Sequence, residues 1–227
     1  MKDFYITQIA TVKTGFKDLF KRGKYEEVVL DVLNKSKIIF KFKFKQIQEQ
    51  AHGEPDFVDE NNNKYEVKLL IDDSQGKAIG DKKSKDLINW FERIKNEIEE
   101  IGPLKIRESI KNNKQSPIAN STLYKIMIKD LLNIKEDETA ILFIPYPIVF
   151  DDENDNSITK MVSDDLDSVY KEIAKQENIK NKGTFYIYPS ANTGRTVIRN
   201  ANTKEREYVE STEMNKYIMY ETTLRKK

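Results

Sequence analysis

Two short apolar segments on either side of a polar loop constrain the fold of this chain more than any other feature. Glu54–Val58 and Lys64–Ile71 have the residues of β-strands, and Asp59–Asn63 between them ends in three successive asparagines. This pattern predicts a β-hairpin. If the hairpin turns about Asn61, residues at equal distances before and after Asn61 face each other across the two strands.

The segments around the hairpin have helical or strand-like periodicity. Helices are predicted over Gly15–Asn34, with an interruption at Gly23, and over Ser84–Ile101, Ser121–Leu132 and Met161–Gln176. Strands are predicted over Lys37–Gln46, Thr139–Phe150 and Thr184–Pro189. This order predicts an α/β fold in which helices flank a central mixed β-sheet. No repeat or shift in composition marks a second domain, so residues 1–227 are expected to form a single domain.

The composition excludes several kinds of functional site. The chain has no cysteine and one histidine, His52, which excludes thiolate and multi-histidine metal sites and makes a Ser-His-Asp triad unexpected. Any metal site must therefore use oxygen ligands, which favours magnesium, manganese or calcium. The 39 basic and 38 acidic residues give a net charge of +1, which neither indicates nor excludes binding to nucleic acid.

Long apolar segments are missing from the sequence. The first residues lack the apolar run of a signal peptide, and no stretch approaches the roughly 20 apolar residues of a membrane span. We therefore expect a cytoplasmic protein that has no membrane partner.

The predicted hairpin brings two acidic residues and one basic residue together. Asp56 and Glu66 lie five residues before and after Asn61, so their Cβ atoms are expected about 4.5–5.5 Å apart. Strand alternation places Lys68 on the same face as Glu66. Two carboxylates this close can share a divalent cation, and the carbonyl of Val67 could complete the coordination. The alternative is a cross-strand salt bridge on the solvated face of an ordinary hairpin.

The residues Pro55-Asp56, followed after nine residues by Glu66-Val67-Lys68, resemble the motif of the PD-(D/E)xK restriction-endonuclease-like nucleases. The order of predicted elements from Gly15 to Phe150 is also similar to the core of that superfamily. The resemblance implies a magnesium-dependent nuclease that acts on DNA, in which manganese can substitute. It also implies that Asp56 and Glu66 are metal ligands, with Lys68 as the base or stabiliser.

The resemblance has further implications for the site and the assembly. Family members commonly place a glutamate from the first helix near the metal, and Glu26 and Glu27 are the candidates here; Glu54 is a third candidate carboxylate. The chain's size resembles that of type II restriction enzymes, which implies a homodimer acting on double-stranded DNA. Residues from about 104 to 133 and from about 190 to 227 would be family-specific additions.

Two alternatives to a restriction enzyme stay open. One is a repair, recombination or transposon-type nuclease of the same fold with little sequence specificity, and the other is a non-catalytic nucleic-acid-binding protein of this fold.

Several polar side chains outside the motif have the chemistry of DNA contacts. Each candidate also has an interpretation without a ligand. The lysines would then belong to an edge strand that prevents aggregation, the residues after the hairpin to a plain connection, and the arginines to a basic loop. The candidates are Lys41, Lys43, Gln75, Lys77, Arg195 and Arg199.

Overall fold

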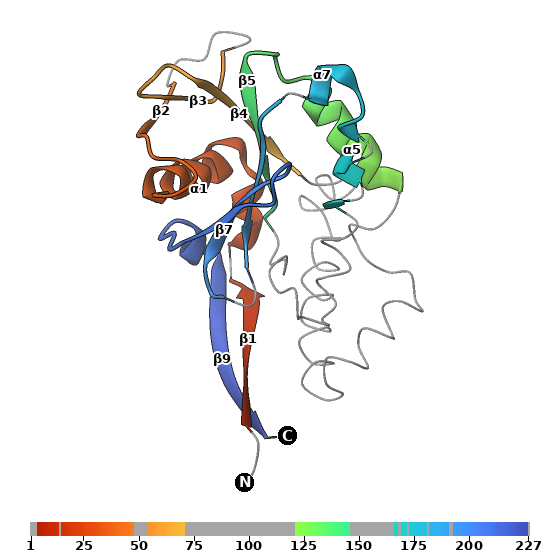
Figure 1. Ribbon diagram of the computed structural model, residues 1–227. Coiled ribbons are helices and arrows are strands. Elements are labelled where there is room, and N and C mark those ends of the chain that lie inside the picture. The colour runs from red at the N-terminus through yellow and green to blue at the C-terminus, as the bar shows by residue number, and fades with distance from the viewer. Residues whose placement is uncertain are drawn as a thin grey trace.

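The computed structural model describes residues 4–13, 15–47, 54–70, 121–145, 166–167, 169–171, 173–180, 182–190 and 193–226. Within these residues the strands form one sheet of seven strands and one of two strands (Figure 1). No helix in the described part is long and apolar enough to span a bilayer.

The seven-stranded sheet is mixed, as predicted. Its strand order is β2-β3-β4-β5-β6-β7-β8, and β4, β5 and β6 run parallel while the other neighbours are antiparallel. The strands are β2 (Phe44–Gln46), β3 (Phe57–Asp59), β4 (Lys64–Leu69), β5 (Glu138–Phe143), β6 (Thr184–Pro189), β7 (Thr196–Asn200) and β8 (Arg206–Val209).

Helices cover both faces of this sheet, which confirms the broad α/β class. Helix α1 (Arg22–Lys35) lies on one side, and α5 (Ser121–Leu132) and α7 (Glu177–Lys180) lie on the other (Figure 1). On α1 the ring of Tyr25 stacks on that of Phe143 in β5, with centroids 6.3 Å apart. The buried residues of α1 recur at helical spacing, so one stripe of the helix faces the core. They are Val28, Val29, Val32 and Leu33.

The two-stranded sheet joins the two ends of the chain. Strand β1 (Phe4–Val12) pairs with β9 (Ile218–Lys226) in an antiparallel ribbon that extends away from the rest of the described structure (Figure 1). A short 3-10 helix, η2 (Met214–Lys216), precedes β9. Neither strand was predicted from the sequence.

The first predicted helix is divided at a different residue from the expected one. A 3-10 helix, η1 (Phe16–Phe20), ends where the N–H of Lys21 donates to the carbonyl of Asp18. Lys21 is extended, with φ −75° and ψ 135°, and α1 begins directly after it. The expected interruption at Gly23 is wrong, because Gly23 lies within α1.

The predicted strand over Lys37–Gln46 is wrong for most of its length, since only Phe44–Gln46 forms a strand. The N–H groups of Lys37 and Ile39 donate to the Glu207 carboxylate of β8, and the N–H of Phe40 donates to the Ser36 hydroxyl. These backbone donors are therefore not available for a strand ladder.

Three other predicted elements are present in whole or in part. The Thr184–Pro189 strand has the predicted bounds, the Ser121–Leu132 helix is α5, and the Thr139–Phe150 strand is found as β5, which ends at Phe143. The predicted helix over Ser84–Ile101 lies outside the described residues, as do residues 104–120 and 146–150.

Candidate active site

The hairpin formed by β3 and β4 has the register expected from the sequence. Phe57 pairs with Tyr65 and Val58 with Lys64, so the centre of the turn is Asn61 and the predicted register is confirmed. The same register, continued by one residue, places Asp56 opposite Glu66.

Asp59 holds the turn of this hairpin. Its Oδ1 accepts hydrogen bonds from the N–H groups of Asn61 and Asn63 at 2.8 and 2.9 Å. Its Oδ2 accepts from the Asn63 amide at 2.8 Å and from the Tyr65 hydroxyl at 3.0 Å. Burial acts to raise the pKa of Asp59, but the bonds from Asn63, Asn61 and Tyr65 outweigh it, so the pKa lies below its usual value. The carboxylate therefore fixes the register by binding both sides of the turn.

Asp56 lies directly before β3 and is only 2% exposed. Its Oδ2 accepts a hydrogen bond of 2.8 Å from the backbone N–H of Val67 in β4. The N–H and C=O of one residue in an extended strand point to the same edge. The Val67 carbonyl therefore points to the edge of β4 where Asp56 lies.

Glu66 and Lys68 lie on one face of β4, as predicted. The Nζ of Lys68 donates to the Oε1 of Glu66 at 2.5 Å, and both side chains are partly buried. Burial raises the pKa of Glu66; the hydrogen bond from Lys68 lowers it, and the negative charge of Asp56 raises it. The net result is a raised pKa. The site therefore holds two acidic groups whose charges repel, with one ammonium beside them.

The structure separates the candidate supporting glutamates. Glu26 of α1 is buried, and its Oε2 accepts a bond of 3.0 Å from the side-chain amide of Gln46 in β2. The N–H of Ile47, the next residue, donates to the Asp56 carbonyl at 3.4 Å, so Glu26 faces the strand end next to Asp56. Glu27 is exposed and paired with Lys24 at the surface.

Glu54, the third candidate carboxylate, is exposed. Among the residues that the structure describes, no three histidine, cysteine, aspartate or glutamate side chains are grouped closely enough to hold a metal ion. The described donors for a cation are thus the Asp56 and Glu66 carboxylates, to which the Val67 carbonyl is the expected addition.

The candidate DNA contacts have different environments. Lys41 and Lys43 are exposed, and Arg195 is exposed 3.7 Å from Glu210. Gln75 and Lys77 lie outside the described residues.

Arg199 is buried within the protein instead of lying at a surface loop. Its guanidinium donates to both carboxylate oxygens of Asp167, at 2.7 and 2.9 Å. This bidentate pair ties β7 to the helical residues around Asp167.

Three polar residues that organise the structure were not predicted from the sequence. Asp59, Asp167 and Glu207 are each held by several hydrogen bonds. A signal existed only for Asp59, because Asp and Asn side chains commonly bind the backbone of their own turn. The partners of Asp167 and Glu207 are distant in sequence.

Comparisons with family models, with curated proteins and with solved structures found no match for this chain. Its function must therefore be inferred from its residues and their geometry.

Proposed function

We propose that this protein is a magnesium-dependent endonuclease with a restriction-endonuclease-like core. The observation that carries the proposal is the arrangement of Asp56, Glu66 and Lys68. Asp56 is buried against the backbone of β4, Glu66 is close enough for the two charges to interact, and Lys68 contacts Glu66.

The donor set suits magnesium. Mg²⁺ prefers oxygen ligands, is commonly held by one or two carboxylates, and keeps several water molecules. Asp56 and Glu66 supply the carboxylates, and Val67 would supply a carbonyl oxygen. When bound, the ion would neutralise phosphate oxygens and lower the pKa of a coordinated water; Mn²⁺ would substitute.

Lys68 would act on the phosphate directly. An ammonium has three donors, so Lys68 can hold Glu66 in place and also reach a phosphate oxygen or a water molecule. Placed beside the scissile phosphate, it would orient the attacking water and stabilise negative charge in the transition state. Its partly buried position would strengthen this effect relative to bulk water.

The order of elements supports the fold part of the proposal. Helix α1 precedes β2, the β3–β4 hairpin follows, and α5 precedes β5, which pairs with β4 in parallel. This is the order that the family resemblance implies. We further propose that the substrate is double-stranded DNA and that two copies cut one strand each, as in type II restriction enzymes.

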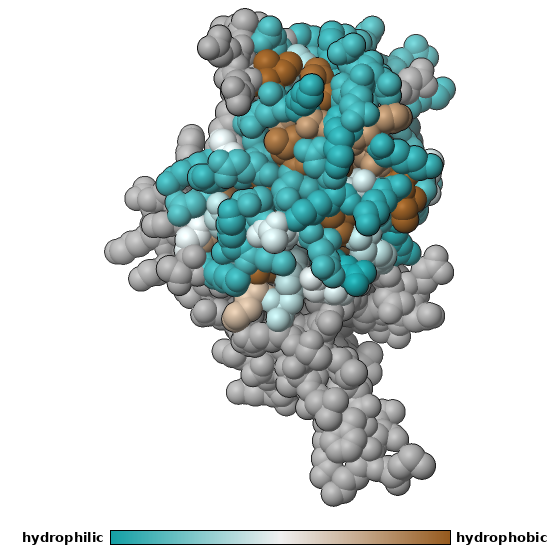
Figure 2. All heavy atoms as spheres, turned by 90° about the vertical axis from the view of Figure 1, so that its left-hand side faces the viewer, coloured by the Kyte–Doolittle hydropathy of each residue, from teal (hydrophilic) through white to brown (hydrophobic). Residues whose placement is uncertain are grey.

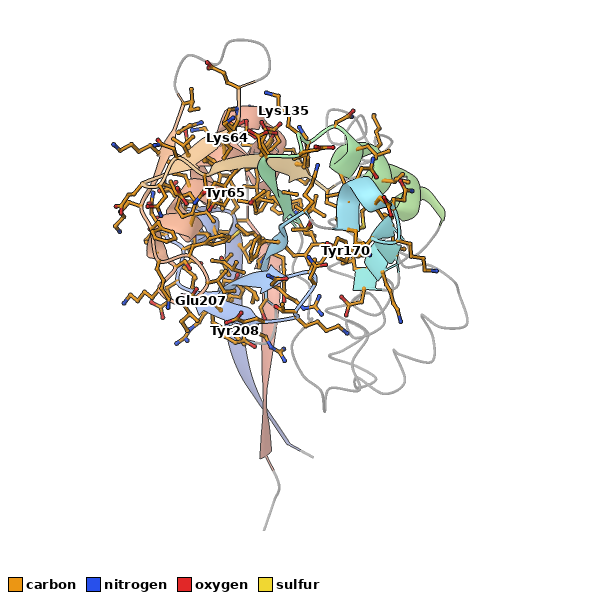
Figure 3. The ribbon with its side chains drawn as sticks, turned by 45° about the horizontal axis from the view of Figure 1, so that its top comes forward. Lys64, Tyr65, Lys135, Tyr170, Glu207 and Tyr208 are labelled. Atoms are coloured by element: carbon orange, nitrogen blue, oxygen red, sulfur yellow. The ribbon has the colours of Figure 1, made fainter. Side chains whose placement is uncertain are left out.

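Cleavage of supercoiled plasmid in Mg²⁺ or Mn²⁺ tests the proposal, with Lys68→Ala and Asp56→Asn as the test variants. Lys64→Ala is the matched control, because Lys64 shares the strand and face of Lys68 but pairs with Asp137 at the exposed start of β4 (Figure 3). Wild type and Lys64→Ala should cut, and the two test variants should not.

The pattern of products distinguishes the nuclease classes. Defined fragments indicate a restriction enzyme, and a smear indicates a nuclease of low specificity. Cutting that persists with chelator, or equal cutting by Lys68→Ala and Lys64→Ala, would contradict the proposed site. If wild type does not cut plasmids of varied sequence, the nuclease proposal is contradicted and a non-catalytic nucleic-acid-binding protein of this fold becomes the favoured alternative.

A further inference from the structure

The segment that leads from the end of α1 into β2 carries a run of lysines. We call residues Lys37–Lys45 the basic loop; it contains Lys37, Lys41, Lys43 and Lys45. No acidic residue occurs in the sequence between Asp31 and Glu49, although the whole chain is almost neutral at +1. The loop is therefore a local excess of positive charge on a balanced surface.

The four lysines of the basic loop are grouped without carboxylate partners, whereas many lysines elsewhere in the described residues are paired. All four are exposed, and none forms an ion pair with a described carboxylate. Lysines elsewhere are commonly paired, so the charge of the basic loop is available to an anionic partner. The paired ones are Lys21, Lys24, Lys35, Lys64, Lys68, Lys135, Lys204 and Lys216.

Aromatic residues alternate with these lysines, and one of them faces solvent. Phe40 and Phe44 are buried and pack on each other and on Tyr65 of β4, with ring centroids 4.9–5.8 Å apart. Phe42 between them is 42% exposed, and Ile38 is 58% exposed. Figure 2 shows apolar atoms exposed among hydrophilic ones on the face of the molecule that carries α1 and β2.

The Glu207 carboxylate of β8 holds the start of the basic loop. It accepts hydrogen bonds from the N–H groups of Lys37 at 2.6 Å and Ile39 at 3.0 Å, and from the Ser36 hydroxyl at 2.6 Å. Backbone donors bound to a buried carboxylate are fixed in direction. The backbone conformation at the start of the segment that carries Phe42 is therefore fixed.

Asn34 of α1 holds the end of the basic loop in the same way. Its side chain accepts from the N–H of Phe44 at 2.8 Å and donates to the Phe44 carbonyl at 3.3 Å. The Nζ of Lys43 also donates to the Asn34 carbonyl at 3.2 Å. The exposed residues from Lys41 to Lys43 thus lie between two anchored ends, so ordering them costs little entropy when a ligand binds.

We propose that the basic loop binds a single-stranded segment of nucleic acid, with a base stacked on Phe42 and phosphates paired with Lys41 and Lys43. An aromatic ring flanked by cations matches a base flanked by phosphates, and such stacking tolerates any sequence. A lipid surface fits less well, because inserting Phe42 would bring both flanking ammonium groups into the apolar layer.

The position of the basic loop connects it to the candidate active site, and in this respect the inference rests on the proposed function. Ile47 lies five residues after Phe42 in the chain. The N–H of Ile47 donates a hydrogen bond to the Asp56 carbonyl. At about 3.3 Å per residue the five residues span at most about 16 Å, or roughly five nucleotides at duplex spacing. One strand could therefore contact both the basic loop and Asp56.

Fluorescence anisotropy with a labelled single-stranded oligonucleotide, in the presence of chelator, tests the inference without cleavage. Phe42→Ala should weaken binding about tenfold, as expected for loss of one stacked base. The double variant Lys41→Ala/Lys43→Ala should also weaken binding and reduce the slope of log K against log salt by about 1.4. Lys24→Ala is the control, because Lys24 is also exposed but is paired with Glu27.

Unchanged affinity in either test variant overturns the inference, and so does an equal loss in Lys24→Ala. Binding to vesicles of anionic lipid that depends on Phe42, without binding to the oligonucleotide, overturns it in favour of a membrane surface.

The two proposals can fail separately. If the protein cuts plasmid but the variants of the basic loop bind the oligonucleotide as tightly as wild type does, the nuclease proposal stands and the inference about the basic loop is contradicted. If oligonucleotide binding depends on the basic loop but the protein does not cut plasmid, the inference is supported and the nuclease proposal is contradicted. Phe42 is exposed, so its replacement should not prevent folding.

Discussion

The buried carboxylate of Glu207 is a single residue on which the conformation of a whole segment depends. It accepts hydrogen bonds from three backbone N–H groups and one hydroxyl. In Glu207→Gln the charge is lost and an NH₂ group faces backbone donors, so the free energy of unfolding should fall by about 2 kcal/mol. Urea denaturation measures this change. Glu210→Gln, at an exposed neighbouring position, should change it by less than about 0.5 kcal/mol.

The same residue should make stability depend on pH. Burial acts to raise the pKa of Glu207, but hydrogen bonds from Ser36, Ile39, Lys37 and Ile38 lower it below its usual value. A depressed pKa gives stability that is fully present above the pKa of the unfolded state and is lost as pH falls through the folded pKa. Wild type should therefore lose more stability below about pH 4.5 than Glu207→Gln does; parallel acid-denaturation curves would contradict this role.

Metal binding should distinguish the two neighbouring glutamates of α1. Millimolar Mg²⁺ or Mn²⁺ should raise the Tm of wild type, because a ligand that binds only the folded state stabilises it. The rise should vanish in Asp56→Asn and decrease in Glu26→Gln, since Glu26 faces the strand end beside Asp56. Glu27→Gln is the matched control and should respond like wild type. Differential scanning fluorimetry provides the measurement.

At the scale of secondary structure, the β3–β4 hairpin depends on its turn. Asp59→Ala removes four hydrogen bonds that hold the turn, so we expect a loss of about 2 kcal/mol in stability. Loosening the register should also separate Asp56 from Glu66 and abolish the metal-induced rise in Tm. Glu60→Ala, at an exposed position in the same turn, should leave both properties unchanged. Thermal denaturation with and without metal tests both effects.

The hairpin could be predicted from the sequence because its determinants are local. The apolar segments, the asparagines and the charged residues all lie between Glu54 and Leu69, so the register and the shared face of Glu66 and Lys68 followed from spacing alone. The choice between Glu26 and Glu27 could not be made this way, since helical spacing does not show which of two adjacent residues faces a strand.

Elements that depend on distant partners could not be predicted. The apolar alternation from Lys37 to Gln46 is that of a strand, but Glu207 of β8 binds the backbone donors that a strand would use. The β1–β9 ribbon pairs the two ends of the chain, and nothing in either short segment indicates its partner. The partner of Arg199 could not be predicted for the same reason, because Asp167 lies far from it in sequence.

At the scale of the whole molecule, the proposed dimer can be tested by mixing chains. If each subunit cuts one strand, a dimer of wild type and Asp56→Asn can cut only one strand of its site. Co-refolded mixtures should therefore accumulate nicked circles in place of linear DNA. A mixture that behaves like diluted wild type would contradict two-strand cutting by a dimer.

The bonds between Glu207 and the backbone of residues 37–39 span 168 to 170 positions of the chain. A ribosome adds about 5–20 residues per second, so residues 37–39 are synthesised roughly 8–34 s before Glu207. During that interval the nascent chain can contain the β3–β4 hairpin while the basic loop still lacks its buried anion. A fragment released before residue 207 would carry the candidate catalytic residues without the shaped loop.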